Sequence, residues 1–484
     1  IMIAASGAIT NAAGGVGTNL LTSTNGPLTI RAGGSVSLDT SVGLADIAST
    51  LNTAAIRITD SGNLSIYGSA FDNTSVTVAA NVLTVGSVGT DSFGATRGAD
   101  TNLGNINQEA SVAITGFALH STGAGTIYAN DTTAGLNVSG GGDANTGVVD
   151  ISSTGQVIIS ANLETGGNLL IDAGSSEYKQ NTDVVVTSGA AITITADTFT
   201  VLSNVANAFV SPNTLTIKQS TNGRTIGLGG GAGDLNISDT ELADIVGATG
   251  DTVATLALGD TNTGAINIDT ALINANTTLI GLSLAVDDAA NQIQLTSGKN
   301  LTIKADGAID LGTSARTIAM SGGELSITSK DGTTGNAGAI NINNTGGGSG
   351  AFSIGQIKTS GTQTVSFLGS TGNIEDNLSD ILPDVIATSV VVTLGDSKFG
   401  VAGDTIDIET MTATGLTVNS VGGLHIRTSE ALTLNQEIDV RSTTGSITLI
   451  GSKNNSAFTQ QNGNLLKAHS ASGNIIIQFD DVAL

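Results

Sequence analysis

The fold is decided by residues 415–450, which read GLTVNSVGGLHIRTSEALTLNQEIDVRSTTGSITLI. Within them Leu416, Leu424 and Leu432 each open a short apolar–polar–apolar segment, and they follow one another at intervals of eight residues. Alternation with a period of two places aliphatic side chains on one face of a strand and polar ones on the other. The spacing leaves no room for helical crossovers. These segments are therefore predicted to be short, half-buried strands that follow one another directly.

The same strand pattern recurs along the whole chain, flanked by Gly, Asn, Asp, Ser or Thr. Glycine often stands one or two residues before a strand, as in Gly167-Asn168-Leu169 and Gly473-Asn474-Ile475. Tight-hairpin dipeptides such as Asn-Gly are sparse for so many strands, which disfavours an array of antiparallel sandwiches. We therefore expect an all-β chain: a right-handed parallel β-helix (β-solenoid) with about 20 residues per coil. Further copies are residues 28–30, 56–58, 64–66, 192–194, 215–217, 301–303, 325–327, 340–342 and 406–408.

The composition fits a narrow, repetitive core. Charged residues make up only 12% of the 484 residues, against about 25% in a typical globular domain. The mean hydropathy is +0.23, so the chain has apolar surface to bury and is not a disordered tract. Aromatic residues are only 3%. The core must therefore be built from Val, Ile, Leu and Ala, which suits many small coils better than one large core.

A longer repeat predicts short helical turns inserted between coils. Asp244 precedes Gly259 by the same distance along the chain as Asp380 precedes Gly395. Each copy begins with a helix N-cap candidate followed by an apolar pair at helical spacing, and a reduced third copy surrounds Leu44. The predicted turns lie near residues 41–50, 238–248 and 375–386. Apart from them, residues 1–484 are expected to form one continuous β-solenoid that is an internal segment of a longer chain.

One stretch carries a family resemblance. Residues 225–230, the strand Leu235-Asn236-Ile237, the turn at 241–245 and residues 264–268 together resemble the repeat region of filamentous-haemagglutinin-type giant bacterial exoproteins. This motif covers roughly residues 215 to 270, and looser units such as Gly307-Ala308-Ile309 cover most of the rest. The resemblance implies a right-handed β-helix, secretion across the outer membrane, and adhesive or scaffolding roles. The N-terminal secretion domain typical of that family is not visible.

Charge and composition exclude several classes of function. The chain has 16 basic and 41 acidic residues and a net charge of −25, which argues against binding to nucleic acid and to an anionic lipid surface. No apolar run approaches the roughly 18 residues of a membrane span. The absence of cysteine from the sequence excludes disulfides, thiolate metal sites and a cysteine nucleophile.

The candidate metal ligands are few. His425 occupies the polar position of its strand, so we expect it to point outward into solvent. Residues 230–235 approach the calcium-binding nonapeptide pattern, but they are one residue short of its spacing, and residues 140–143 fail in the same way. Asp234 and Asp143 are therefore weak Ca²⁺ candidates, and no other cofactor is expected.

Catalysis would need carboxylates, with a basic residue beside them, on neighbouring coils. The pairs Asp287–Asp288 and Asp480–Asp481 are adjacent in sequence, so their side chains face opposite sides of a strand. We therefore expect no catalytic site and no enzyme activity. A β-helical polysaccharide lyase or hydrolase, or a carbohydrate-binding surface protein, is the alternative that such a cluster would support.

These observations predict an extracellular structural or adhesive rod on the bacterial cell surface. It would space, coat or join cells, and its coils could add end to end into a filament or sheath. The expected partners are further copies of the chain, other cell surfaces or a polysaccharide.

Overall fold

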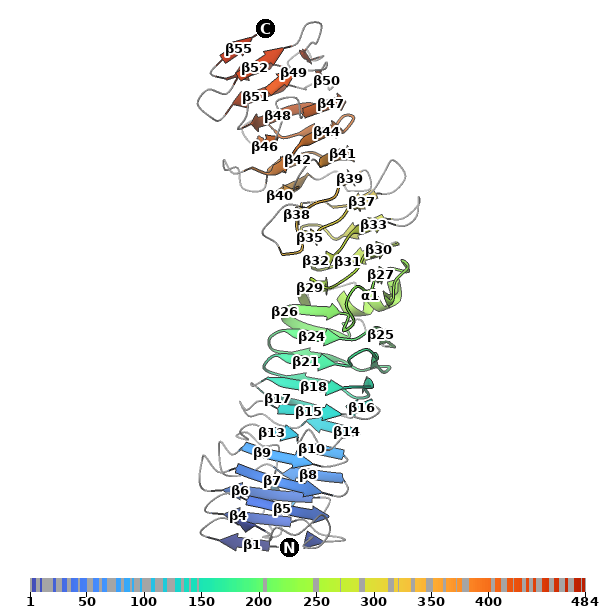
Figure 1. The fold of residues 1–484 in the computed structure, drawn as a ribbon, viewed down its shortest axis with the longest axis vertical. Helices are drawn as coiled ribbons and strands as arrows, with labels where there is room; N and C mark the ends of the chain where they lie inside the picture. Colours follow the sequence, from blue (N-terminus) through green and yellow to red (C-terminus); the bar gives the residue numbers. More distant parts are fainter. Residues whose placement is uncertain are drawn as a thin grey trace. The chain divides into compact units, whose positions relative to one another are not determined.

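The computed structural model shows a parallel β-solenoid (Figure 1). It describes the strands between Met2 and Asn145, residues 148–202, 207–246, 252–269, 271–286 and 292–311, and the strands with several connecting segments from residue 317 to residue 483. The chain divides into two compact units. Unit 1 is Ile1–Thr221 with Asp244–Ala254, and unit 2 is Asn222–Ala243 with Thr255–Leu484.

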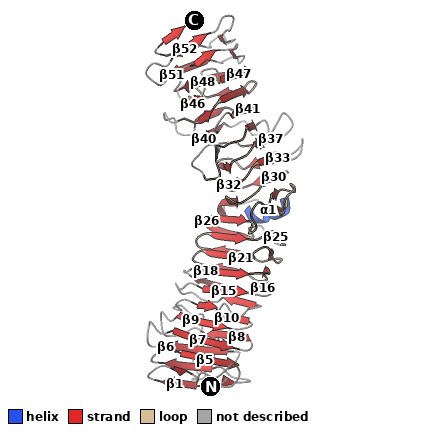
Figure 2. Ribbon diagram, in the orientation of Figure 1, coloured by secondary structure: helices blue, strands red, loops and turns tan. Residues whose placement is uncertain are grey.

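Unit 1 is built from coils whose strands stack in parallel on the coil before. Strands β18 (Val149–Ser153), β19 (Gln156–Ile159) and β20 (Leu163–Thr165) follow one another along the chain. Strands β21 (Leu169–Asp172), β22 (Glu177–Gln180) and β23 (Val186–Ser188) then pair with them in the same order. Each such coil therefore adds one strand to each of three parallel sheets. Figure 2 shows that this region consists of stacked strands joined by loops.

The strands of unit 1 are grouped by sheet. The first sheet has ten strands: β1 (Met2–Ala5), β4 (Leu28–Ala32), β6 (Leu44–Ser49), β8 (Asn63–Tyr67), β10 (Val82–Ser87), β14 (Gly116–Leu119), β16 (Gly135–Val138), β19, β22 and β25 (Thr198–Val201). The second contains β2 (Ile9–Thr10), β3 (Leu21–Thr22), β5 (Val36–Ser41), β7 (Ala55–Asp60), β9 (Ser75–Ala79), β13 (Ile106–Gln108), β15 (Ile127–Asp131), β18, β21, β24 (Ile192–Thr195) and β26 (Phe209–Lys218). The third contains β17 (Gly141–Asn145), β20 and β23 and also ends on β26. Strands β11 (Gly89–Thr90) and β12 (Thr96–Arg97) form an antiparallel pair.

The strands of unit 2 are arranged in the same way. A nine-stranded sheet contains β28 (Leu235–Ile237), β27 (Ile226–Leu228), β30 (Ile266–Ile268), β33 (Leu284–Val286), β36 (Ile309–Leu311), β39 (Ile340–Asn344), β41 (Thr364–Ser370), β44 (Ser389–Thr393) and β47 (Leu416–Ser420). A second series contains β29 (Val253–Gly259), β32 (Asn276–Gly281), β35 (Leu301–Ala305), β38 (Glu324–Thr328), β40 (Phe352–Lys358), β42 (Ile374–Asp376), β43 (Val385–Ala387), β45 (Lys398–Phe399), β46 (Ile406–Thr410), β48 (Gly423–Thr428), β51 (Ile447–Gly451) and β54 (Ile475–Gln478). Smaller parallel sheets contain β31 (Ala271–Ile273), β34 (Gln292–Leu295) and β37 (Thr317–Ala319); β49 (Leu432–Leu434), β52 (Ala457–Gln460) and β55 (Asp481–Ala483); and β50 (Ile438–Val440) with β53 (Leu466–Ala468).

The core of unit 2 is a set of aliphatic columns. The register of the nine-stranded sheet places one apolar side chain of each coil directly over that of the coil before, and all members of the column are buried. The column runs Ile226, Ile266, Leu284, Ile309, Ile340, Val365, Val390 and Leu416. Burying each such side chain stabilises the fold by about 1.5–3 kcal/mol. The alternating pattern in the sequence therefore specifies both the strands and the side that faces the core, and every predicted strand quoted above lies in a strand of the structure.

Aromatic side chains fill part of the core of unit 1. Tyr178 of β22, Phe199 of β25 and Phe209 of β26 lie together, with ring centroids 5.3 to 6.4 Å apart. The buried Tyr178 hydroxyl donates to Gln180 Oε1 at 2.9 Å, and Gln180 Nε2 donates to the carbonyls of Val184 and Ala208. The Tyr178 hydroxyl and the Gln180 side chain are thus satisfied, as burial requires.

The asparagine that precedes many strands joins each coil to the next. Asn168 Oδ1 accepts a hydrogen bond from the Ala191 N–H, 23 residues on. Asn300 Oδ1 accepts one from the Glu324 N–H, 24 residues on, while the Asn300 N–H donates to Asn276 Oδ1. These side chains satisfy backbone donors at the corners of the coils, where the strand ladders stop. The offsets also show that these coils are slightly longer than expected.

Helix α1 (Asp239–Val246) confirms the turn predicted near 238–248. A capping box begins it: Glu241 Oε2 accepts from the Ser238 N–H, and Ser238 Oγ accepts from the Glu241 N–H. Leu242 and Ile245 are buried on one side of the helix. Among the described residues, no helix has the length and apolarity that crossing a bilayer requires.

The other two predicted turns are not confirmed as helical turns. The turn near 41–50 is wrong, because Leu44–Ser49 is strand β6, in which Ala45 and Ile47 pair with Leu28 and Ile30 of β4. In the copy near 375–386, the ends are strands β42 and β43, and residues 377–382 lie outside the described residues. Neither copy has a glutamate three residues after a serine cap, and without that capping box a short apolar pair fits a strand equally well.

Candidate functional site

Two consecutive coils of unit 2 are interrupted at the same place in their stack. Strand β40 runs through without a break, and it pairs with β42 at Phe352 and with β43 at Ile357. Strands β45 and β46 are the corresponding halves of the next coil. Strand β48 again runs through, pairing with β45 at Leu424 and with β46 at Ile426. The chain therefore leaves and re-enters the sheet twice, in neighbouring coils.

Glycines lie at the level of the breaks, both in the interrupted strands and in β40 beside them. In β40 the register shifts between Leu325 and Ile327 of the preceding strand, so that Gly355 falls within a bulge. Gly400 follows β45 with a φ of +73°, a left-handed conformation that favours glycine. A Cβ on Gly400 would come within 2.0 Å of the His425 carbonyl oxygen. Glycine is thus required for the chain to leave the sheet so close to β48.

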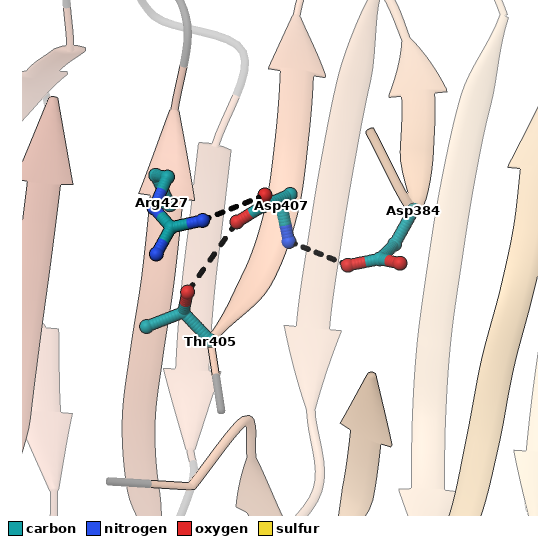
Figure 3. Close-up of polar contacts among 4 residues, drawn as sticks. All are labelled: Asp384, Thr405, Asp407 and Arg427. Atoms are coloured by element: carbon teal, nitrogen blue, oxygen red, sulfur yellow. Dashed lines mark hydrogen bonds and ion pairs between the residues drawn. The ribbon is translucent and has the colours of Figure 1, made fainter. Parts of the chain in front are cut away.

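The strands on either side of these breaks bring acidic and basic side chains together (Figure 3). Asp407 lies opposite Arg427 in the parallel register, and Arg427 Nη1 is 3.1 Å from Asp407 Oδ2. The Asp407 N–H donates to Asp384 Oδ2 at 2.7 Å, and the Asp384 N–H donates to the Asp407 carbonyl at 2.8 Å. Thr405 Oγ1 donates to Asp407 Oδ1 at 3.3 Å. A further carboxyl, that of Asp376 at the end of β42, is hydrogen-bonded to that of Asp384.

This acidic cluster, Asp376, Asp384 and Asp407, is buried, with 7%, 4% and 5% of each residue exposed. Burial, followed by the neighbouring carboxyls, raises the pKa of Asp384 to about 8, although the Asp407 N–H opposes the shift. Burial also raises the pKa of Asp407 to about 6, despite the opposing effects of Arg427 and Thr405. A hydrogen bond between two carboxyls needs a proton on one of them, so the cluster holds a proton near neutral pH.

His425 is not in solvent as expected. It is 4% exposed, and its Nδ1 is 2.9 Å from Thr448 Oγ1 on β51. Burial and the nearby Lys398 lower the pKa of His425. The polar position of a strand does face away from the aliphatic core, but here the segment at Gly400 lies against it. The pattern predicts the direction of the side chain correctly and its exposure wrongly.

Of the two weak calcium candidates, Asp234 is the one whose side chain the structure describes. The exposed Asp234 uses Oδ2 to accept from both the N–H and the hydroxyl of Thr225, each at 3.0 Å, and these bonds lower its pKa. Asp143 lies in β17, and its side chain is outside the described residues. Across the described ranges, no three His, Cys, Asp or Glu side chains are arranged to hold a metal ion.

The glycine-rich segment around Asp234 instead makes an unusually short coil. Strands β27 and β28 pair in parallel although only residues 229–234 join them. The turn is possible because glycine backbones are in contact: a Cβ on Gly227 would lie 2.0 Å from the Gly231 carbonyl oxygen and 2.9 Å from Gly233 N. The glycines thus serve close packing.

Replacing Gly227 with alanine should therefore open this coil. We expect Gly227→Ala to lower the free energy of unfolding by about 1–3 kcal/mol, the range for overpacked sites, and to increase hydrogen exchange in residues 226–237. The exposed Ala232 in the same turn gives a matched control, Ala232→Ser, which should leave both quantities near their original values. Equal thermal midpoints and equal exchange in the two variants would contradict the close contact.

Sequence reasoning missed the acidic cluster. Asp376, Asp384 and Asp407 each look like ordinary polar residues beside a strand, and the carboxylate pairs that were weighed lie elsewhere. Asp480 and Asp287–Asp288 fall outside the described residues. These residues come together only through the pairing of the coils. The sequence pattern does not predict that pairing, because it does not show how many residues the chain uses before it re-enters the sheet. A basic residue 20 positions after an acidic one, as Arg427 follows Asp407, was the one available signal.

No known protein supports the assignment of the fold, which is made from the structure of the chain itself. Comparison with protein-family models, with curated proteins and with solved structures finds no match. The structure is consistent with a β-helical repeat protein, and within each unit it is a parallel β-solenoid.

Proposed function

We propose that the chain is a structural or adhesive element of the bacterial cell surface, of the filamentous-haemagglutinin type. In this proposal it is exported from the cell, where it spaces, coats or joins cells. Its partners are further copies of itself, other cell surfaces or a polysaccharide, and end-to-end addition of coils would extend it into a filament or sheath. It has no catalytic role and needs no cofactor, although Ca²⁺ association with its acidic surface belongs to the same proposal.

One observation supports this proposal: in each unit the coils stack one upon another around a narrow core. In unit 2 the column from Ile226 to Leu416 gains one buried aliphatic residue with each coil. A coil therefore contacts only the coils beside it, and length grows without a thicker core. Such an architecture provides extended surface and stiffness, which are what a spacer or adhesin needs. The net charge of −25 favours solubility over nucleic-acid or lipid binding.

The test is a binding assay with the intact chain. Beads coated with the folded chain should bind bacterial cells, one another or immobilised polysaccharide, and sedimentation velocity should give a high frictional ratio. Beads coated with heat-denatured chain are the matched control. A compact particle in sedimentation, together with no binding above the denatured control on any of the three surfaces, would contradict the proposal.

A β-helical polysaccharide lyase or hydrolase remains a second candidate because of the acidic cluster. Asp384, Asp407 and Arg427 lie on neighbouring coils, the arrangement that such chemistry needs. Against it, the carboxyls are buried and hydrogen-bonded to their own chain. Incubation with acidic and neutral polysaccharides should release no reducing ends. Release that disappears in both Asp384→Asn and Asp407→Asn would favour the enzyme instead.

A further inference from the structure

We propose that the acidic cluster is a pH-sensitive latch that holds the two interrupted coils of unit 2 together through a shared proton. The inference is independent of the proposed function, because it concerns how firmly β42, β43, β45 and β46 are held in the stack. It follows from where the carboxyls lie in the fold.

The latch connects the elements that the interruptions separate. Asp376 ends β42 and Asp384 stands just before β43, so their hydrogen bond joins the two halves of one coil. The Asp384 carboxyl also accepts the Asp407 N–H, which joins that coil to β46. The Asp407 carboxylate in turn pairs with Arg427 on β48, the next unbroken strand. Side chains thus replace part of the strand pairing that the breaks remove.

Charge explains why the latch needs a proton. The cluster has three buried carboxyls, and the guanidinium of Arg427 forms an ion pair with one of them, that of Asp407. If Asp376 and Asp384 were both ionised, their hydrogen bond would be lost and two like charges would face each other with little water between them. One proton, on Asp384, turns this repulsion into a hydrogen bond. The ends of β42 and β43 should therefore stay together only while that proton is bound.

Other charged groups near the latch come from each neighbouring strand. They are Lys358 on β40, Glu375 on β42, Lys398 on β45, Glu409 on β46, and His425 with Arg427 on β48. Of these, His425 is the one whose titration could interfere near neutral pH. Its pKa is lowered, so folding favours the neutral ring, and its contribution to stability grows as the pH rises. That sign is opposite to the effect expected of the latch.

The pKa values give the pH window. Folding raises the pKa of Asp407 to about 6 and that of Asp384 to about 8. For a carboxyl whose pKa is raised by folding, the stabilisation is complete below its ordinary unfolded value and is lost as the pH rises through the folded value. The interrupted coils should therefore be firmest below pH about 4 and loosest above pH about 8.

Hydrogen exchange of the intact chain, corrected for the intrinsic effect of pH, tests this inference. Between pH 6 and pH 9, protection of residues 374–410 should fall by on the order of tenfold or more, since each unit of pKa shift corresponds to a factor of ten. Protection of residues 266–311 in the same unit should change little. An unchanged corrected exchange of residues 374–410 in the original chain would overturn the latch, and this arm requires no variant.

A pair of variants assigns the effect to the cluster. Asp384→Asn keeps an oxygen for the Asp407 N–H and supplies a permanent donor for Asp376, so the fall in protection between pH 6 and pH 9 should become much smaller. Asp396→Asn removes a charge from an exposed position of the same unit and should keep the original pH dependence. The inference fails if Asp384→Asn shows the same fall in protection as the original chain.

Discussion

Replacing Phe209 with alanine should destabilise unit 1 by about 3–5 kcal/mol, the cost of removing a buried aromatic side chain. Phe209 is fully buried, and its ring centroid lies 6.3 Å from that of Tyr178 and 6.4 Å from that of Phe199. The neighbouring coils cannot move into the cavity that the substitution leaves, because the strand pairs of each coil fix its position. The site therefore has little freedom to collapse, which is the condition for a cost at the upper end of the range.

The measurement is chemical unfolding followed by tyrosine fluorescence and by hydrogen exchange of residues 177–201. All three tyrosines, Tyr67, Tyr128 and Tyr178, lie in unit 1 and the chain has no tryptophan, so tyrosine fluorescence reports on the unfolding of unit 1. Leu202→Ala is a matched control, because Leu202 is 46% exposed in the same unit. A loss in Phe209→Ala no larger than in Leu202→Ala would show that the aromatic group does not stabilise unit 1.

Replacing Arg427 with leucine should cost unit 2 about 3–5 kcal/mol at alkaline pH, the penalty for leaving a buried charge without its partner. Asp407 is 5% exposed and has Arg427 3.1 Å away. In the variant, the pKa of Asp407 would rise further, because the effect of Arg427 that lowers it is gone. A protonated Asp407 carries no charge, so the penalty should shrink as the pH falls toward 5.5.

Unfolding of the Arg427→Leu variant at pH 5.5 and pH 9 measures that difference. Lys304→Leu removes a positive charge from β35 of the same unit and serves as the control for net charge. It should change stability by similar, small amounts at both values. A loss in Arg427→Leu that does not depend on pH would mean that the guanidinium contributes packing and little electrostatic stabilisation.

The strands could be predicted from the sequence because their pattern is local. In a segment such as Leu301-Thr302-Ile303, alternation alone states that Leu301 and Ile303 face inward, and both are buried. Parallel pairing followed from the scarcity of hairpin turns, and among the described strands the antiparallel pair is β11–β12. The right-handed sense of the coil stays a prediction, which rests on the general preference of parallel crossovers.

The acidic cluster could not be predicted because it depends on register. Asp384 and Asp407 meet only because one coil leaves the sheet after Asp376 and the next after Phe399, and the sequence pattern does not fix how many residues each excursion takes. The same limit explains His425, whose burial depends on where the chain at Gly400 returns. The helix at 238–248 was predictable because Ser238 and Glu241 make a complete local signal.

The asparagine corners and strand ladders have a mechanical consequence. In each unit the hydrogen bonds between coils run along the direction in which the coils stack, so a pull in that direction loads the interfaces in series. The weakest interface should yield first and leave the others intact. With offsets of 23 and 24 residues between coils, each yielding step would release roughly 80 Å of chain, at about 3.4 Å per residue. Among the described strands of unit 2, those of the two interrupted coils are broken into shorter segments, so these coils would be the first to extend under tension.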